Sequence, residues 1–160
     1  METKRNTISD ARHYKDEIKD LVGKKLPICV DFDGCLCTHH YPMIGKENKP
    51  CVEVLKKWQE NGVGIILDTM RDGKQLEEAV QWCKDRGIKL YGIGKEPGQE
   101  KWTRSNKCYG IFSVDDRNLG VPLITEEGDE EGERPRVDWK KIDELYTEQI
   151  LELAKLYKNT

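Results

Sequence analysis

Two aspartates one residue apart follow a buried apolar run in the segment ICVDFDGCLC, residues 28–37. A strand places residues i and i+2 on the same face, so Asp31 and Asp33 are expected to point the same way. Two like charges on one face repel each other unless a cation or a shared proton relieves them. The pattern therefore raises two alternatives, a metal site and a carboxyl pair that shares a proton.

Acidic residues also follow a later apolar run. Asp115 and Asp116 stand directly after YGIFSV, residues 109–114. The carboxyl ends of parallel strands meet at one edge of a sheet, so we expect this pair to join Asp31 and Asp33 there. A hard divalent cation relieves such a cluster, and Mg²⁺ takes one or two carboxylates together with waters and phosphate oxygens. The carboxylates therefore favour a Mg²⁺ site that accepts a phosphate group.

A phosphate group also needs hydrogen-bond donors at the same edge. Thr69 ends the apolar run VGIILDT, and Arg71 follows two residues later. Lys107 lies just before the last of these strands, with Arg104 and Lys101 as alternatives. Hydroxyl, guanidinium and ammonium groups, together with backbone N–H groups, all bind phosphoryl oxygens. For Arg71 an ion pair at the surface is an equal alternative.

The loop after the first acidic pair adds further candidates. Gly34 allows the chain to turn beside a phosphate. His39 and His40 are close enough in sequence to touch a leaving group, although loop histidines more often face solvent. Tyr41 and Trp102 are stacking surfaces for a base or packed aromatic residues, and packing is the commoner role.

The elements that must position these residues alternate along the chain. Apolar runs predict buried strands at 26–32, 63–69, 88–94 and 109–116, with a short fifth strand at 121–124. Amphipathic spacing predicts helices at 9–22, 51–62, 73–87 and 138–158. This alternation predicts an α/β fold with a parallel sheet. We expect one domain over residues 1–160, with a helical extension at 1–25, a solvated acidic loop at 126–136 and a C-terminal helix.

Composition limits the classes of partner. The net charge of −3 argues against a protein that binds nucleic-acid duplexes, and no apolar run approaches the ~20 residues needed to span a membrane. The first residues lack the apolar core of a signal peptide, so we expect a cytoplasmic protein. The six cysteines are spaced like neither a zinc site nor a disulfide framework, and we expect reduced, structural thiols.

Taken in order, these motifs resemble those of the haloacid dehalogenase-like (HAD) phosphatases. The four motifs of that family correspond to ICVDFDGCL, IILDTMR, a basic residue before the last strand, and FSVDDRN. The resemblance covers roughly residues 26–125 and looks closest to small HAD hydrolases of bacteria and phages. It implies a three-layer, Rossmann-like HAD core with a parallel β-sheet, and it implies phosphomonoester hydrolysis.

The resemblance also implies roles for the acidic residues. Asp31 would be the nucleophile that forms an aspartyl-phosphate. Asp33 would protonate the leaving oxygen and then take a proton from the attacking water. Asp31, the main-chain carbonyl of Asp33 and Asp116 would hold Mg²⁺, with Asp115 as an indirect or alternative ligand.

For the phosphate itself, the resemblance assigns Thr69 to hydrogen bonding and Lys107 to charge neutralisation, and Gly34 and Arg71 join them as phosphate-binding candidates. The segments between the motifs are too short for a large cap domain. A capless HAD enzyme has an open site, which in the family goes with large phosphorylated substrates or with closure by a homo-oligomer. A nucleotide or another small phosphate ester is the substrate class we expect.

Two other function classes remain open. A response-regulator receiver also gathers aspartates and Mg²⁺ on a parallel sheet, but it carries the acidic pair on its first strand and a lone aspartate on its third. Here the acidic pair comes last, which disfavours that alternative. A catalytically silent HAD scaffold that binds a partner is the other class.

Overall fold

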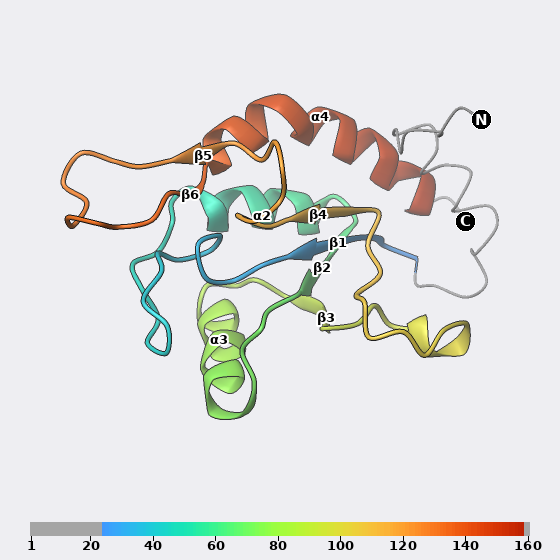
Figure 1. Cartoon of the computed structure of the whole chain (residues 1–160). Helices are drawn as coiled ribbons and strands as arrows, with labels where there is room; N and C mark the ends of the chain where they lie inside the picture. The colour runs from blue at the N-terminus through green and yellow to red at the C-terminus, as the bar shows by residue number, and fades with distance from the viewer. Residues whose placement is uncertain (1–23, 159–160) are drawn as a thin grey trace, which may run out of the picture.

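The apolar runs form a four-stranded parallel sheet (Figure 1). The structure, a computed structural model, describes residues 24–158, so the helix expected at 9–22 lies outside the described residues. The strands are β1 (Leu26–Val30), β2 (Val63–Leu67), β3 (Leu90–Ile93) and β4 (Phe112–Val114), in the order β3-β2-β1-β4. All neighbouring strands are parallel, which confirms the predicted α/β fold.

The two central strands account for the unbroken apolar runs. Every residue of β1 and β2 is buried, because both faces of the sheet are covered. Ile28 on β1 pairs with Ile65 on β2 and with Phe112 on β4. This register brings the carboxyl ends of the three strands level, so the residues that follow them meet at one edge of the sheet.

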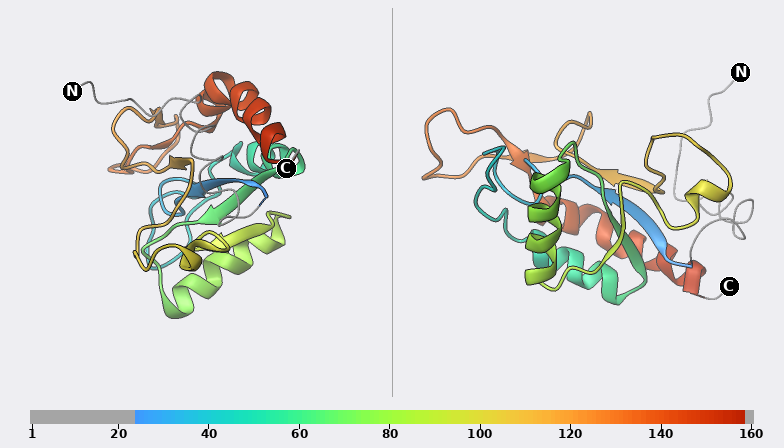
Figure 2. Two further views of the ribbon diagram at one scale, coloured as in Figure 1. Left: turned by 90° about the vertical axis from the view of Figure 1, so that its right-hand side faces the viewer. Right: turned by 90° about the horizontal axis from the view of Figure 1, so that it is seen from below.

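Two helices pack together over one face of the sheet (Figure 2). α2 (Cys51–Glu60) packs on β2, and α4 (Trp139–Lys158) packs on β1 and on α2. The rings of Trp58 and Trp139 meet edge to face with centroids 5.7 Å apart, and Nε1 of Trp58 donates to Oγ1 of Thr147 at 2.8 Å. The predicted C-terminal helix is therefore confirmed, and it forms part of the core.

The remaining helices follow β2 and β3. α3 (Gly73–Asp85) packs against β3 at the edge of the sheet. The connection from β3 to β4 contains a short 3₁₀ helix, η1 (Gln99–Lys101). Cys29 of β1 contacts Cys108 of this connection. None of the helices in the described part of the chain is both long and apolar enough to cross a membrane.

A short antiparallel ribbon lies apart from the main sheet (Figure 1). It consists of β5 (Leu123–Ile124) and β6 (Arg136–Val137). The predicted strand at 121–124 therefore exists in part, but it pairs with β6 and not with the parallel sheet. The acidic loop was predicted to extend to residue 136, whereas Arg136 begins β6 and is buried.

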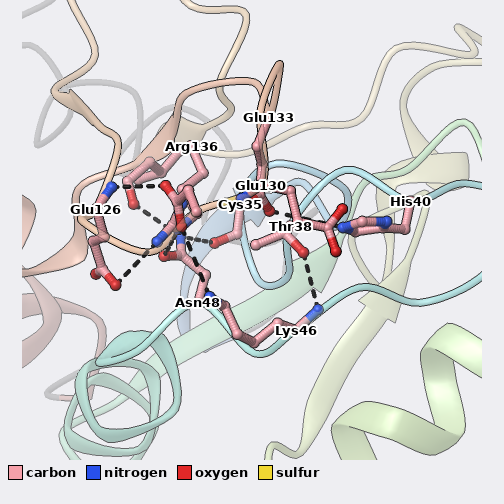
Figure 3. A network of polar contacts seen from close by, with 11 residues as sticks. Cys35, Thr38, His40, Lys46, Asn48, Glu126, Glu130, Glu133 and Arg136 are labelled. Carbon is pink, nitrogen blue, oxygen red and sulfur yellow. Dashed lines mark hydrogen bonds and ion pairs between the residues drawn. The ribbon is translucent and has the colours of Figure 1, made fainter.

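Arg136 fixes the acidic loop to the body of the protein (Figure 3). Its guanidinium donates from Nη1 to Oδ2 of Asp129 at 2.9 Å and from Nε to Oδ1 of Asn48 at 3.1 Å, and it pairs with Glu126 at 3.2 Å. The Arg136 guanidinium holds the pKa of the Asp129 carboxyl below its usual range. The acidic loop is therefore exposed along most of its length, as predicted, but it is anchored at its two ends.

Candidate active site

Three carboxylates gather where β1 and β4 end. The side chains of Asp31, Asp115 and Asp116, here called the acidic trio, each offer an oxygen within 4.8 Å of the others. Asp31 follows β1 and the other two follow β4, which is paired to β1 in the sheet. The backbone N–H of Asp31 donates to the carbonyl of Val114 at 2.9 Å and extends that pairing to the edge. Strand pairing thus brings together residues that are more than 80 positions apart.

The acidic trio is electrostatically strained. Burial raises the pKa of Asp31 from 3.8 to about 8, and the charge of Asp115 and contact with Asp116 add to this effect. Burial is also the main cause that raises the pKa of Asp115. A divalent cation bound to the oxygens would offset these charges, and a set of carboxylate oxygens is what Mg²⁺ prefers. The donor atoms therefore fit the expected metal.

Gly34 and His39 close one side of the acidic trio. Nε2 of His39 lies 3.0 Å from Oδ2 of Asp116, and both side chains are largely buried. Gly34 has a φ of +78°, which favours glycine, and a Cβ there would collide with the His39 ring and lie 2.7 Å from Oδ2 of Asp116. His39 therefore contacts the candidate site, and the prediction of a turn at Gly34 is confirmed.

The side chain of Asp33 points to Arg71 and not to the acidic trio. Nε and Nη2 of Arg71 donate to the two carboxylate oxygens of Asp33, each at 2.8 Å. The same guanidinium donates to the carbonyls of Pro42 and Met43, and Arg71 is 3% exposed. Of the two alternatives for Arg71, the structure contains an ion pair, and this ion pair is buried. Phosphate binding by Arg71 stays a prediction that would require the pair to open.

The two other phosphate-binding candidates differ in their surroundings. Thr69 is half-buried just beyond β2, and its Oγ1 accepts a hydrogen bond from the backbone N–H of Arg71 at 3.1 Å. Lys107 is exposed, and its backbone bonds to Ser105 and Gln99 hold the turn that carries it. Its ammonium group is at the surface, so its predicted role depends on reaching the site from there.

A second cluster, which the sequence did not reveal, lies near the end of β2. Cys29, Asp68 and Cys108 each offer a ligand atom within 4.8 Å of the others. The sequence predicted structural thiols for the two cysteines and no role for Asp68. No spacing rule could have paired them, since Cys29 and Cys108 are 79 residues apart. All six cysteines are free thiols, and five are buried, as expected.

One solved structure is similar to this chain over most of the length of both proteins. It is described as the conserved protein coded by a locus from Bacteroides thetaiotaomicron, and it aligns with a TM-score of 0.63 at 34% sequence identity. The match covers 78% of this chain and 92% of the other. No protein-family model and no curated protein matches the chain.

Proposed function

The chain belongs to the same family as the conserved Bacteroides thetaiotaomicron protein, and from its acidic site we propose that it is a Mg²⁺-dependent phosphomonoester hydrolase. The observation that carries this proposal is the acidic trio, Asp31, Asp115 and Asp116. Its carboxylates converge at the carboxyl edge of a parallel sheet, which is where ligands bind in such folds. Thr69 lies at the end of the strand beside β1 and supplies a hydroxyl donor there.

In the proposed reaction Asp31 attacks the phosphorus atom of the ester. An Asp31 oxygen forms a bond to phosphorus while the bond to the leaving oxygen breaks, and an aspartyl-phosphate results. A water then attacks the phosphorus and releases inorganic phosphate. A bound Mg²⁺ would favour the ionised form of Asp31 and draw charge from the phosphoryl oxygens.

Asp33 is proposed to transfer the protons of both steps. It would give one to the leaving oxygen and later take one from the attacking water. Because Arg71 occupies both of its carboxylate oxygens, Asp33 would have to give up one of these hydrogen bonds whenever it carries a proton. Arg71 is therefore proposed as the residue that orients Asp33 and returns it to the ionised state.

Within the α/β class, the fold that we propose is a HAD core without a large cap. Within residues 24–158 the long connections are the loop at residues 31–50, the segment between β3 and β4, and the acidic loop, and the additional sheet there is the two-stranded β5–β6 ribbon. His40 of the first loop lies 3.7 Å from Glu133 of the acidic loop, so the two loops meet (Figure 3). The proposed substrate class is a nucleotide or another small phosphate ester.

The strand order argues against the receiver-like alternative. The order β3-β2-β1-β4 is that of the first four strands in the Rossmann order 3-2-1-4-5-6, whereas receivers have the flavodoxin-like order 2-1-3-4-5. The catalytically silent scaffold remains the competing function, and an activity assay separates it from the hydrolase.

The test is hydrolysis of p-nitrophenyl phosphate by the full chain with Mg²⁺, with EDTA and as Asp31→Asn. We expect turnover that EDTA abolishes and that Asp31→Asn lowers by roughly a thousandfold or more. Asp85→Asn, an exposed residue on α3, is the matched control and should keep full activity. A folded wild-type protein without turnover on this ester or on a panel of nucleotides and sugar phosphates would favour the silent scaffold.

A further inference from the structure

We propose that Cys29 and Cys108, here called the thiol pair, form a reversible disulfide on exposure to a peroxide. Their Sγ atoms lie 2.9 Å apart. Cys29 is in β1, two residues before Asp31, and Cys108 belongs to the connection that leads into β4. The proposed hydrolysis uses neither thiol, so this site is additional to it.

The separation of the thiol pair favours a disulfide over a shared metal ion. Two thiolates on a tetrahedral Zn²⁺ at about 2.3 Å are about 3.8 Å apart, which is well beyond the observed contact. Gly110 helps to create the contact, because a Cβ at this position would lie 2.7 Å from Sγ of Cys29. The chain can therefore run directly over Cys29 and bring Cys108 against it.

Access to solvent singles out one member of the pair. Cys108 is half-buried, whereas the other five cysteines are fully buried. Cys29 is only 3% exposed, so a dissolved oxidant does not reach its sulfur. Cys108 is therefore the thiol that an oxidant meets first, and Cys29 is the thiol that resolves the product.

The oxidation occurs in two balanced steps. Hydrogen peroxide transfers one oxygen to Sγ of Cys108, which gives a sulfenic acid and one water. Sγ of Cys29 then attacks Sγ of Cys108, the S–S bond forms, and the hydroxyl leaves as a second water with the proton of Cys29. The two thiols lose two electrons and the peroxide gains them. Asp68, whose carboxylate lies within 4.8 Å of both sulfurs, is placed to carry that proton.

The disulfide would tie the β3–β4 connection to β1. Lys107 is the neighbour of Cys108 in the chain, and the bond would fix the backbone on which its side chain is mounted. An effect of oxidation on phosphatase turnover would rest on the proposed function. Formation of the disulfide itself does not depend on that function.

The test is intact-mass and peptide analysis of the full chain after brief exposure to hydrogen peroxide, with the remaining thiols alkylated in denaturant. We expect the loss of two hydrogens, two fewer alkylated thiols, and a peptide that links residues 29 and 108. Dithiothreitol should restore all six thiols, and the thermal midpoint should be higher in the oxidised protein because a long loop is closed.

Two variants make the outcome specific. Cys108→Ser should abolish the mass change, and Cys83→Ala, which keeps the thiol pair, should retain it. Oxidation of Cys108 to a sulfinic acid while Cys29 stays alkylatable would overturn the proposal, as would linkage of other cysteines. Protection of both thiols by Zn²⁺ without loss of hydrogens would replace it with a metal site. None of these results depends on phosphatase activity.

Discussion

Asp31 is the residue of the acidic trio whose pKa departs furthest from its ordinary value, chiefly because it is buried. Its folded-state pKa of about 8 lies above the ordinary value of 3.8, so the folded protein keeps a proton that the unfolded chain releases. In a buffer without divalent cations, this effect makes the free energy of unfolding fall as the pH rises from about 4 to about 8. A nucleophile in this setting needs a counter-charge near neutral pH.

The first prediction follows from this loss of stability with rising pH. In EDTA, the denaturant midpoint should fall between pH 5 and pH 8, and Asp31→Asn should flatten that fall because the amide does not titrate. Urea titrations of both proteins at the two pH values measure it. Equal pH dependence in the variant and the wild type would mean that Asp31 is not strained.

Arg71 is the second residue with a distinct expected effect. It is buried against Asp33 and the carbonyls of Pro42 and Met43. Arg71→Ala should lower the free energy of unfolding by about 3 kcal/mol, because it leaves Asp33 without its partner. Arg71→Lys keeps the charge but loses the bidentate contact with Asp33. Its free energy of unfolding should lie between those of the wild type and Arg71→Ala. A loss below about 1 kcal/mol in urea unfolding of Arg71→Ala would contradict a structural role.

At the scale of elements, Arg136 is the buried side chain that ties the acidic loop to the start of β6. Arg136 joins Asn48 to Asp129 and Glu126 (Figure 3), and these contacts hold the acidic loop against the loop that follows β1. The loop that follows β1 reaches the acidic trio, since its His39 contacts Asp116. The ribbon therefore supports one wall of the candidate site.

Replacing Arg136 with methionine should release the acidic loop. We expect a protease specific for glutamate to cleave residues 126–133 at least several-fold faster in Arg136→Met than in the wild type, because cleavage follows local opening. Arg134→Met changes an exposed arginine of the same loop and should leave the rate unchanged. Equal cleavage of both variants would show that Arg136 does not anchor the loop.

The parallel strands could be predicted from the sequence, whereas the ribbon could not. The runs at β1 and β2 are apolar because both of their faces are buried, and this signal is strong in a single sequence. β6 contains two residues, one of them charged, so it has no readable period. Of the four aspartates predicted to gather at this edge, three form the acidic trio because each follows an apolar strand, whereas Asp33 pairs with Arg71.

The pairing of side chains was much less predictable. Arg71 and Asp33 are 38 residues apart, and the sequence alone gave equal weight to a phosphate contact and an ion pair. The thiol pair depends on how the β3–β4 connection crosses the sheet, and this crossing follows from tertiary packing alone. Motifs at strand ends thus predict a site, while the contacts inside it depend on the loops.

At the scale of the whole molecule, metal binding should stabilise the fold. A ligand that binds only the folded state at 100 times its Kd adds about 2.7 kcal/mol to the free energy of unfolding. Mg²⁺ should therefore raise the thermal midpoint at pH 8, and Asp116→Asn should reduce that rise. Asp85→Asn removes an exposed carboxylate on α3, outside the acidic trio, and should respond like the wild type. An identical midpoint with Mg²⁺ and with EDTA would contradict the metal site.

The most direct test of the hydrolase is capture of the proposed phosphorylated aspartate. The full chain is mixed with a phosphate ester and Mg²⁺, quenched in acid within one turnover and reduced with borohydride, which converts an acyl phosphate to an alcohol. Mass spectrometry should locate the reduction at Asp31, and EDTA should prevent it. Turnover with no reduction at Asp31, or with reduction at a different aspartate, would contradict Asp31 as the nucleophile.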